Sequence, residues 1–121
     1  MARVTLEDSD IVVRLSPWET AAAHRHEVRV PVSVLREVYV EPDWWRALRG
    51  VSKTGWWIPA RWCRGVRRHG DGEDFAAVKA GGPVLCIELG GSAPFRRLAV
   101  SVPDPGEFVR ALLPLVPRDR V

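Results

Sequence analysis

Tryptophan and arginine are the side chains with the clearest binding chemistry in this chain, and both gather in its middle. Five of the six tryptophans lie between Asp43 and Gly72, with arginines interspersed among them. An indole buries a large area and a guanidinium stacks on its face, so both residue types are enriched in the energetic centres of protein interfaces. We therefore define a candidate binding site, the Trp/Arg surface, formed by Trp44, Trp45, Arg46, Arg49, Trp56, Trp57, Arg61, Trp62 and Arg64.

Two adjacent pairs, Trp44–Trp45 and Trp56–Trp57, constrain where these indoles lie. Successive side chains of a strand point to opposite faces, so a pair within a strand places at least one indole near the surface. Three uses are open: indoles that fill the core, a protein-binding or self-association surface, and stacking of single-stranded nucleic acid. We predict the second use, in a non-enzymatic binding or assembly module whose partner is another protein or a second copy, with nucleic acid as the alternative.

The other polar residues give little support for catalysis or metal binding. His24 and His26 would face the same way on a strand, but the neighbouring sequence supplies no third ligand. His69 follows two arginines in a segment that we expect to be a solvent-exposed loop, and no GxSxG motif is present. The Gly81-Gly82-Pro83 and Gly90-Gly91-Ser92 turns do not lead into helices, which a phosphate-binding loop requires. We predict no catalytic residue, metal or cofactor, and keep a small enzyme with an unrecognised site as a further alternative.

Length and composition predict a single domain over residues 1–121. Hydrophobic residues make up 46% of the chain and charged residues 27%, which is typical of a soluble globular protein. The net charge is +3, but the 15 acidic residues are scattered among the 18 basic ones, so charge alone does not indicate nucleic acid. With neither a membrane-spanning run nor a signal-peptide pattern, we expect a cytoplasmic protein with buried thiols at Cys63 and Cys86, the latter on the less buried side of its strand.

The elements that would position the Trp/Arg surface are mostly strands. Alternating or apolar runs predict strands over Ile11–Leu15, Trp18–Ala23, His26–Val32 and Leu35–Val40, before the irregular middle of the chain. Three further runs, Phe75–Ala80, Val84–Leu89 and Phe95–Val102, predict an antiparallel meander.

A helix is expected after the last strand. Asp104 would cap it, Pro105 would occupy its first position and Glu107 would complete a capping box. Phe108 and Leu112 would then face the sheet, and Pro114 would end the helix.

The closing segment from Leu98 to Pro105, the Val30-Pro31-Val32-Ser33-Val34 segment and the Gly50–Gly65 stretch together resemble bacterial pleckstrin-homology-like domains of an uncharacterised actinobacterial type. The resemblance spans most of the chain. It implies a mainly β fold, a small seven-stranded bent antiparallel barrel capped by one C-terminal helix, and a role in binding or assembly.

The same resemblance raises the question of phosphoinositides. Domains of this kind that bind such lipids use a run of Lys and Arg around the first hairpin. Here the corresponding region has Arg14, His24, Arg25 and Arg29, interrupted by Glu19 and three alanines. We therefore do not expect headgroup binding.

Overall fold

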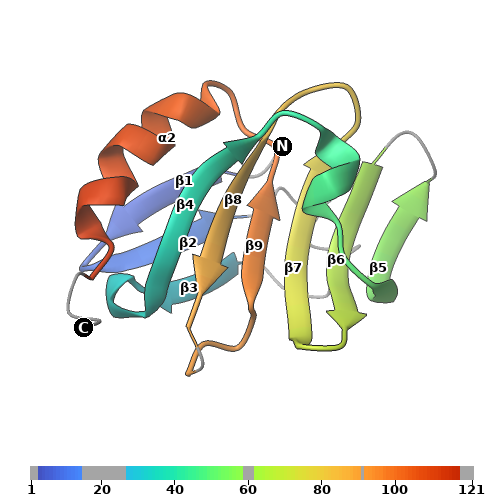
Figure 1. Cartoon of the computed structure of the whole chain (residues 1–121), viewed down its shortest axis with the longest axis horizontal. Helices are drawn as coiled ribbons and strands as arrows, with labels where there is room; N and C mark the ends of the chain where they lie inside the picture. The colour runs from blue at the N-terminus through green and yellow to red at the C-terminus, as the bar shows by residue number, and fades with distance from the viewer. Residues whose placement is uncertain (1–2, 15–26, 59–61, 91, 118–121) are drawn as a thin grey trace.

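The computed structural model describes residues 3–14, 27–58, 62–90 and 92–117, with backbone alone for 51–58 and 62–64. The described part is mainly β, with one α-helix near the C-terminus (Figure 1). Its strands form a three-stranded sheet, β1-β2-β3, and a six-stranded sheet in the order β4-β8-β9-β7-β6-β5. The strands are β1 (Arg3–Glu7), β2 (Asp10–Arg14), β3 (Glu27–Pro31), β4 (Leu35–Glu41), β5 (Val51–Ile58), β6 (Trp62–His69), β7 (Gly72–Lys79), β8 (Val84–Leu89) and β9 (Arg97–Val100).

The three-stranded sheet contains a strand that the sequence analysis missed. β1 pairs antiparallel with β2 through a two-residue turn at Asp8 and Ser9, both of which have positive φ. This is the backbone twist that tight hairpins favour. β3 pairs with the other side of β2 and ends at Pro31 on the edge of the sheet, a position that proline tolerates because it has no N–H to donate to a neighbouring strand. The predicted strand over Trp18–Ala23 lies outside the described residues.

The prediction of an antiparallel meander in the last three strands is wrong. β9 is inserted between β8 and β7, where it pairs antiparallel with β8 and parallel with β7. The turn from β7 to β8 therefore crosses the position between them that is filled by β9, which comes later in the sequence. Strand length and turn residues do not reveal this order, because they report local geometry and not which strand fills the gap.

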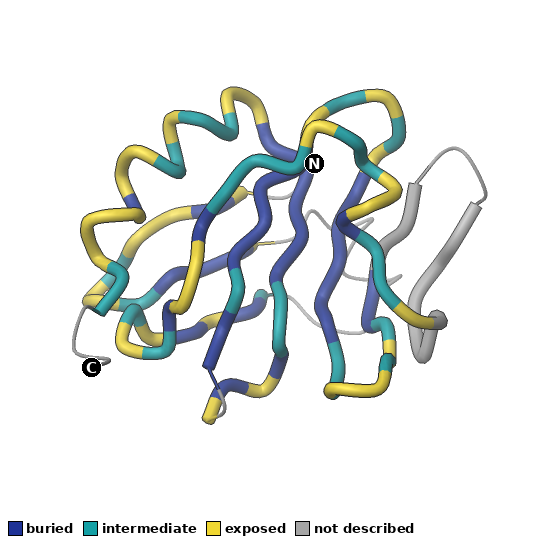
Figure 2. The backbone as a smooth tube through the Cα atoms, in the orientation of Figure 1, coloured by how far each residue is buried: buried dark blue, intermediate teal, exposed yellow. Residues whose placement is uncertain are grey.

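The main core lies between the two sheets. Val13, Val30, Phe75, Ile87 and Leu98 share this apolar cluster, and each is fully or almost fully buried. We call the side of the six-stranded sheet that contributes to it the inner face. Its central strands are buried along most of their length (Figure 2). Among the described strands the two sheets are separate and do not form a closed barrel, so the seven-stranded barrel stays a prediction.

Helix α2 (Pro105–Leu112) packs against β4 and β8 and adds Leu112 to the main core, with Phe108 partly buried beside it. Pro105 occupies the first turn as predicted, but the capping box is wrong. Asp104 has φ 51 and its side chain makes no capping hydrogen bond; only its backbone carbonyl accepts from the N–H of Glu107. A short 3-10 turn, η3 (Leu113–Leu115), follows the helix. No helix in the described ranges has the length and apolar character needed to span a membrane.

Candidate functional site

The opposite, outer face of the six-stranded sheet has a row of charged residues across four adjacent strands. Glu88 of β8 lies opposite Arg97 of β9, which lies opposite Asp74 of β7, which lies opposite Arg67 of β6. Since the strands alternate, these positions share a face with the small buried residues Ala76, Val78, Val84, Cys86 and Ala99. We call Glu88, Arg97, Asp74 and Arg67 the charged row. Acidic and basic side chains alternate along it, which lets each meet an opposite charge on the next strand.

The charged row is covered by a segment from the middle of the chain, residues 43–50, which we call the arm. It contains a short 3-10 helix, η2 (Trp44–Ala47), seen in front of β7 in Figure 1. Ala47 is buried on the small outer-face cluster, and Trp44 and Leu48 are partly buried beside it. At the end of the arm Gly50 has φ 70, and a Cβ there would lie 1.9 Å from the carbonyl oxygen of Arg68. Only glycine lets the chain pass this closely over β6.

Arginines of the charged row hold the backbone of the arm. Arg97 donates from Nη1 to the carbonyl oxygen of Ala47 at 3.2 Å. Arg67 donates from Nε to the carbonyl oxygen of Arg49 at 3.1 Å and from Nη2 to that of Gly50 at 2.6 Å. Three carbonyl groups of the arm, those of Ala47, Arg49 and Gly50, are thus hydrogen-bonded to side chains of the sheet.

Acids of the charged row hold the arm's own arginine. Arg49 donates from Nε and Nη2 to the two carboxylate oxygens of Asp74, at 2.7 and 2.8 Å, and its Nη2 lies 3.9 Å from Oε1 of Glu88. The hydrogen bonds to Asp74 raise the pKa of Arg49. Asp74 is 1% exposed, and its second partner is Nε2 of His69 at 2.9 Å. A bidentate guanidinium and an imidazole together satisfy this buried carboxylate.

His69 is therefore not the solvent-exposed loop residue that its sequence context predicted. It is the last residue of β6, and its side chain is 9% exposed. Nδ1 accepts from the backbone N–H of Asp71 at 3.2 Å, and Nε2 faces Asp74. Both ring nitrogens are thus engaged within the fold, so the histidine has no free nitrogen with which to activate a nucleophile.

At the β8 end of the charged row lie the chain's single tyrosine and a buried thiol. Tyr39 donates from its hydroxyl to Oε2 of Glu88 at 2.9 Å, and Arg97 donates from Nε to the same oxygen at 2.5 Å. Burial is the main cause of a raised pKa at Tyr39 and raises the pKa of Cys86 to about 11. Cys86 is a fully buried free thiol, so the expectation that it lies on a less buried side is wrong. Both faces of β8 are covered, one by the core and one by the arm.

The arm carries the described part of the predicted Trp/Arg surface. Trp44 and Trp45 are in η2 and not in a strand, and their rings meet edge to face, with centroids 6.1 Å apart and planes at 88°. Trp44 packs on the outer-face cluster, whereas Trp45 is 57% exposed. Arg46 is exposed near Asp43, while Arg49 is used inside the fold.

The structure brings together four of the nine predicted residues, Trp44, Trp45, Arg46 and Arg49, in and beside η2, whereas four others lie on β5 and β6. Trp56 and Trp57 occupy consecutive positions of β5, the edge strand, and Trp62 and Arg64 lie on β6. The side chains of these four, and Arg61 as a whole, lie outside the described residues. The charged row itself was missed, although in β7, β8 and β9 its charged residue alternates with small residues at every second position, as in Asp74, Ala76 and Val78.

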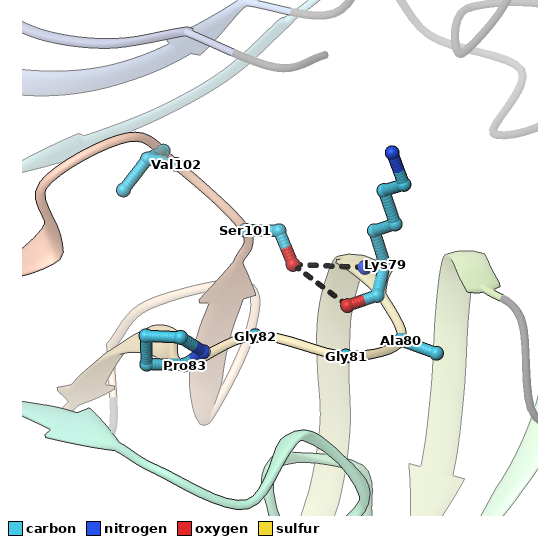
Figure 3. Close-up of a pocket in the computed structure, with 7 residues that line it drawn as sticks. All are labelled: Lys79, Ala80, Gly81, Gly82, Pro83, Ser101 and Val102. Atoms are coloured by element: carbon cyan, nitrogen blue, oxygen red, sulfur yellow. Dashed lines mark hydrogen bonds between the residues drawn. The ribbon is translucent and has the colours of Figure 1, made fainter.

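A shallow cavity of about 260 Å³ lies at the β7–β8 turn, lined by Lys79, Ser101 and the Gly81-Gly82-Pro83 segment among others (Figure 3). Ser101 accepts from the backbone N–H of Lys79 at 2.8 Å, and the lysine side chain extends away from its hydroxyl. The serine therefore ties two strand ends together, and no serine–lysine catalytic pair is formed there.

Neither a metal site among the described residues nor a match to a known family is found for this chain. Within the described ranges, no three His, Cys, Asp or Glu side chains are grouped so as to hold a metal ion. His24 and His26 lie outside those ranges. Comparison of the chain with protein-family models, with curated proteins and with solved structures finds no match.

Proposed function

We propose that this protein is a non-enzymatic binding module that recognises a protein partner through the arm, with Trp45 as the anchor. The observation that carries the proposal is an indole more than half exposed on a segment tied to the sheet by the buried charged row. A rigid aromatic side chain loses little conformational freedom on binding and buries a large area, which is typical of a hot spot.

The surroundings of Trp45 support a protein partner over nucleic acid. Single-stranded nucleic acid needs arginines free to meet phosphates along the stacking surface. Arg49 is bonded to Asp74, and Arg46 lies 3.6 Å from Asp43. An indole flanked by self-neutralised charges suits the apolar centre and polar rim of a protein interface. Binding of oligonucleotides is an outcome of the test below.

The pleckstrin-homology-like kinship and its bent barrel are also part of this proposal. Two packed sheets and a helix that follows the last strand support it. The parallel pairing of β7 with β9 departs from an antiparallel barrel. An experimental structure of the full chain would decide between a closed barrel of seven strands and two separate sheets.

Affinity capture with the natural chain and two single variants tests the binding function. Trp45→Ala removes the anchor, and Leu113→Ala removes a side chain of similar exposure, 53%, at the end of α2. A partner held by the natural chain and by Leu113→Ala, but lost with Trp45→Ala, supports the proposal. The partner is then purified and titrated, where we expect the anchor variant to lose about tenfold or more in affinity.

Two results would contradict the proposal. One is a partner that binds the Trp45→Ala and Leu113→Ala variants equally well. The other is a tryptophan fluorescence change with single-stranded oligonucleotides that weakens steeply with salt and needs Trp45, which would assign the arm to nucleic acid instead.

A further inference from the structure

Within the described part of the chain, the edge of β1 away from β2 has backbone groups without a strand partner, at a defined spacing. Among the described strands β1 pairs with β2 alone. Glu7 and Asp10 close the two-residue turn, so they form the hydrogen-bonded pair next to it. Hydrogen-bonded and non-hydrogen-bonded pairs alternate along an antiparallel ladder, which leaves Val4 and Leu6 in non-hydrogen-bonded pairs. Their N–H and C=O groups therefore point away from β2, toward the free edge.

An apolar cavity of about 260 Å³ lies along this same edge, between β1 and the segment that leads into α2. Its walls are three consecutive residues of β1, Arg3, Val4 and Thr5, together with Val102, Pro103 and Phe108. Consecutive strand residues point to opposite faces, so a cavity that touches all three lies beside the strand and not on one face. The next residue, Leu6, is 51% exposed.

The sequence of β1, Arg3-Val4-Thr5-Leu6-Glu7, is complementary to itself when reversed. In an antiparallel pair of two β1 strands centred on Thr5, each Arg3 lies opposite a Glu7 and each Val4 opposite a Leu6. The residues with outward backbone groups, Val4 and Leu6, then face each other in hydrogen-bonded pairs. The two Thr5 residues fall in the non-hydrogen-bonded pair between them. In this one register the outward backbone groups are paired, apolar side chains lie opposite each other, and each arginine lies opposite a glutamate.

We propose that two copies of this chain associate through their β1 edges, antiparallel and with Thr5 on the two-fold axis, into one continuous six-stranded sheet. Leu6 of each copy lies opposite Val4 of the other and on the same face. That position places the leucine side chain against the cavity that Val4 and Phe108 line. The exposed apolar side chain and the apolar cavity are therefore the two halves of an isologous contact, separate from the arm.

Charge on the outward side of the three-stranded sheet supports a second copy as the occupant. Within one chain Arg3 is paired in register with Arg14, a like charge directly opposite, which is unfavourable. The outward face has three acids (Glu7, Asp10 and Glu27) and three arginines (Arg3, Arg14 and Arg29), and the ion pairs around Glu7 join the acids to Arg14 and Arg29. In the pair of β1 strands each Arg3 lies opposite Glu7 of the other copy, so a second copy supplies the opposite charge that Arg3 does not meet across β2.

Sedimentation over a range of concentrations tests the association. The natural chain is expected to form a dimer. Leu6→Asp should weaken it by about tenfold or more, because two buried leucines are replaced by charges. The Leu6→Asp chain should remain folded, with an unchanged melting temperature for the monomer, since Leu6 is half exposed there. Trp45→Ala should leave the dimer intact, which separates this inference from the proposed binding function.

A cysteine placed on the two-fold axis tests the register independently of affinity. Opposed residues of a non-hydrogen-bonded pair have Cα atoms about 4.5 Å apart, within the range for a disulfide. Thr5→Cys should therefore cross-link two chains under mild oxidation, and Ser9→Cys, at the exposed turn, should not. The natural chain, treated alongside, shows any contribution of Cys63 and Cys86.

Three results would overturn the inference. They are a monomer at every concentration, a dimer that Trp45→Ala dissociates but Leu6→Asp does not, and equal cross-linking through Ser9→Cys and Thr5→Cys.

Discussion

Two charged clusters on opposite sides of the molecule use the same residue types in different surroundings. On the three-stranded sheet, Glu7 accepts hydrogen bonds from Arg14, and about a third of its side chain and nearly half of that of the arginine are exposed. On the outer face of the six-stranded sheet, Asp74 binds Arg49 beneath the arm, where the carboxylate side chain is 2% exposed. Water can replace the partners of Glu7, whereas nothing in the fold can replace those of Asp74.

The difference shows how a loop can serve as a covering layer. The arm makes few apolar contacts with the sheet, those of Ala47, Leu48 and Trp44 with the outer-face cluster. It is held mainly by charged side chains that bind its carbonyl groups and its arginine. Burial makes these bonds strong and also makes the loss of any one of them costly. We therefore infer that the charged row serves to fix the position of Trp45 and not to carry out chemistry itself.

Among the substitutions that test this comparison, replacing Asp74 should have the largest effect on the stability of the fold. Asp74→Ala leaves Arg49 and His69 without their shared acceptor under the arm, and we expect a loss of about 3–5 kcal/mol in unfolding free energy, measured by urea denaturation. Backbone amides of residues 47–50 should also exchange hydrogen faster, because the arm is released.

The matched control is Asp71→Ala, an exposed acid three residues earlier in the same hairpin. Its loss should stay within about 0.5 kcal/mol, as is usual for surface positions. Equal effects of the two variants would mean that the charged row does not hold the arm.

Tyr39 provides a smaller, pH-dependent test of the same region. Tyr39→Phe removes the hydroxyl that donates to Glu88, and we expect a loss of about 1.5–3 kcal/mol at neutral pH, the range for a bond to a charged group. Burial raises the pKa of Tyr39 in the folded state, so ionisation favours the unfolded chain. The advantage of the natural chain over Tyr39→Phe should be complete below the usual tyrosine pKa of about 10 and shrink above it.

Absorbance at alkaline pH checks the mechanism, because Tyr39 is the chain's single tyrosine. The phenolate signal should rise together with unfolding. A signal that rises near pH 10, as for a free tyrosine, while the chain stays folded would contradict the buried hydrogen bond to Glu88.

Much of the fold follows from local patterns, and the exceptions have a common cause. The alternation that predicted strands over His26–Val32 and Phe95–Val102 puts the apolar residues of each strand on one face, and the structure buries that face in the main core, at Val28, Val30, Leu98, Val100 and Val102. It missed β1, which has only Val4 and Leu6 as apolar positions, and it missed the insertion of β9 between two earlier strands. Both depend on which strands become neighbours, and that choice is made by tertiary packing and not by any one segment.

The candidate site was predicted only in part for the same reason. Composition grouped Trp45 and Arg49 in one predicted binding surface, whereas the structure shows Trp45 exposed and Arg49 bonded to Asp74 within the fold. Arg49 and Asp74 are 25 residues apart and meet only because the arm folds back over β7. His69 was predicted to be a loop residue, since a polar side chain next to glycine usually faces water. The burial of His69 and Asp74 can be explained only once the strand register is known.

The smallest expected effect is that of replacing Glu7 in the exposed charged cluster of the three-stranded sheet. Hydrogen bonds from Arg14 and Thr5 lower the pKa of Glu7 to about 2, from 4.5. This carboxylate therefore adds stability above about pH 4.5 that is lost as the pH falls toward 2. Glu7→Gln should flatten the dependence of melting temperature on pH across that window, so that the variant melts slightly below the natural chain at neutral pH and at about the same temperature near pH 2. Asp8→Asn, in the adjoining turn, is the control. An acid-side slope that survives Glu7→Gln but disappears with Asp8→Asn would show that the ionic cluster is not organised around Glu7.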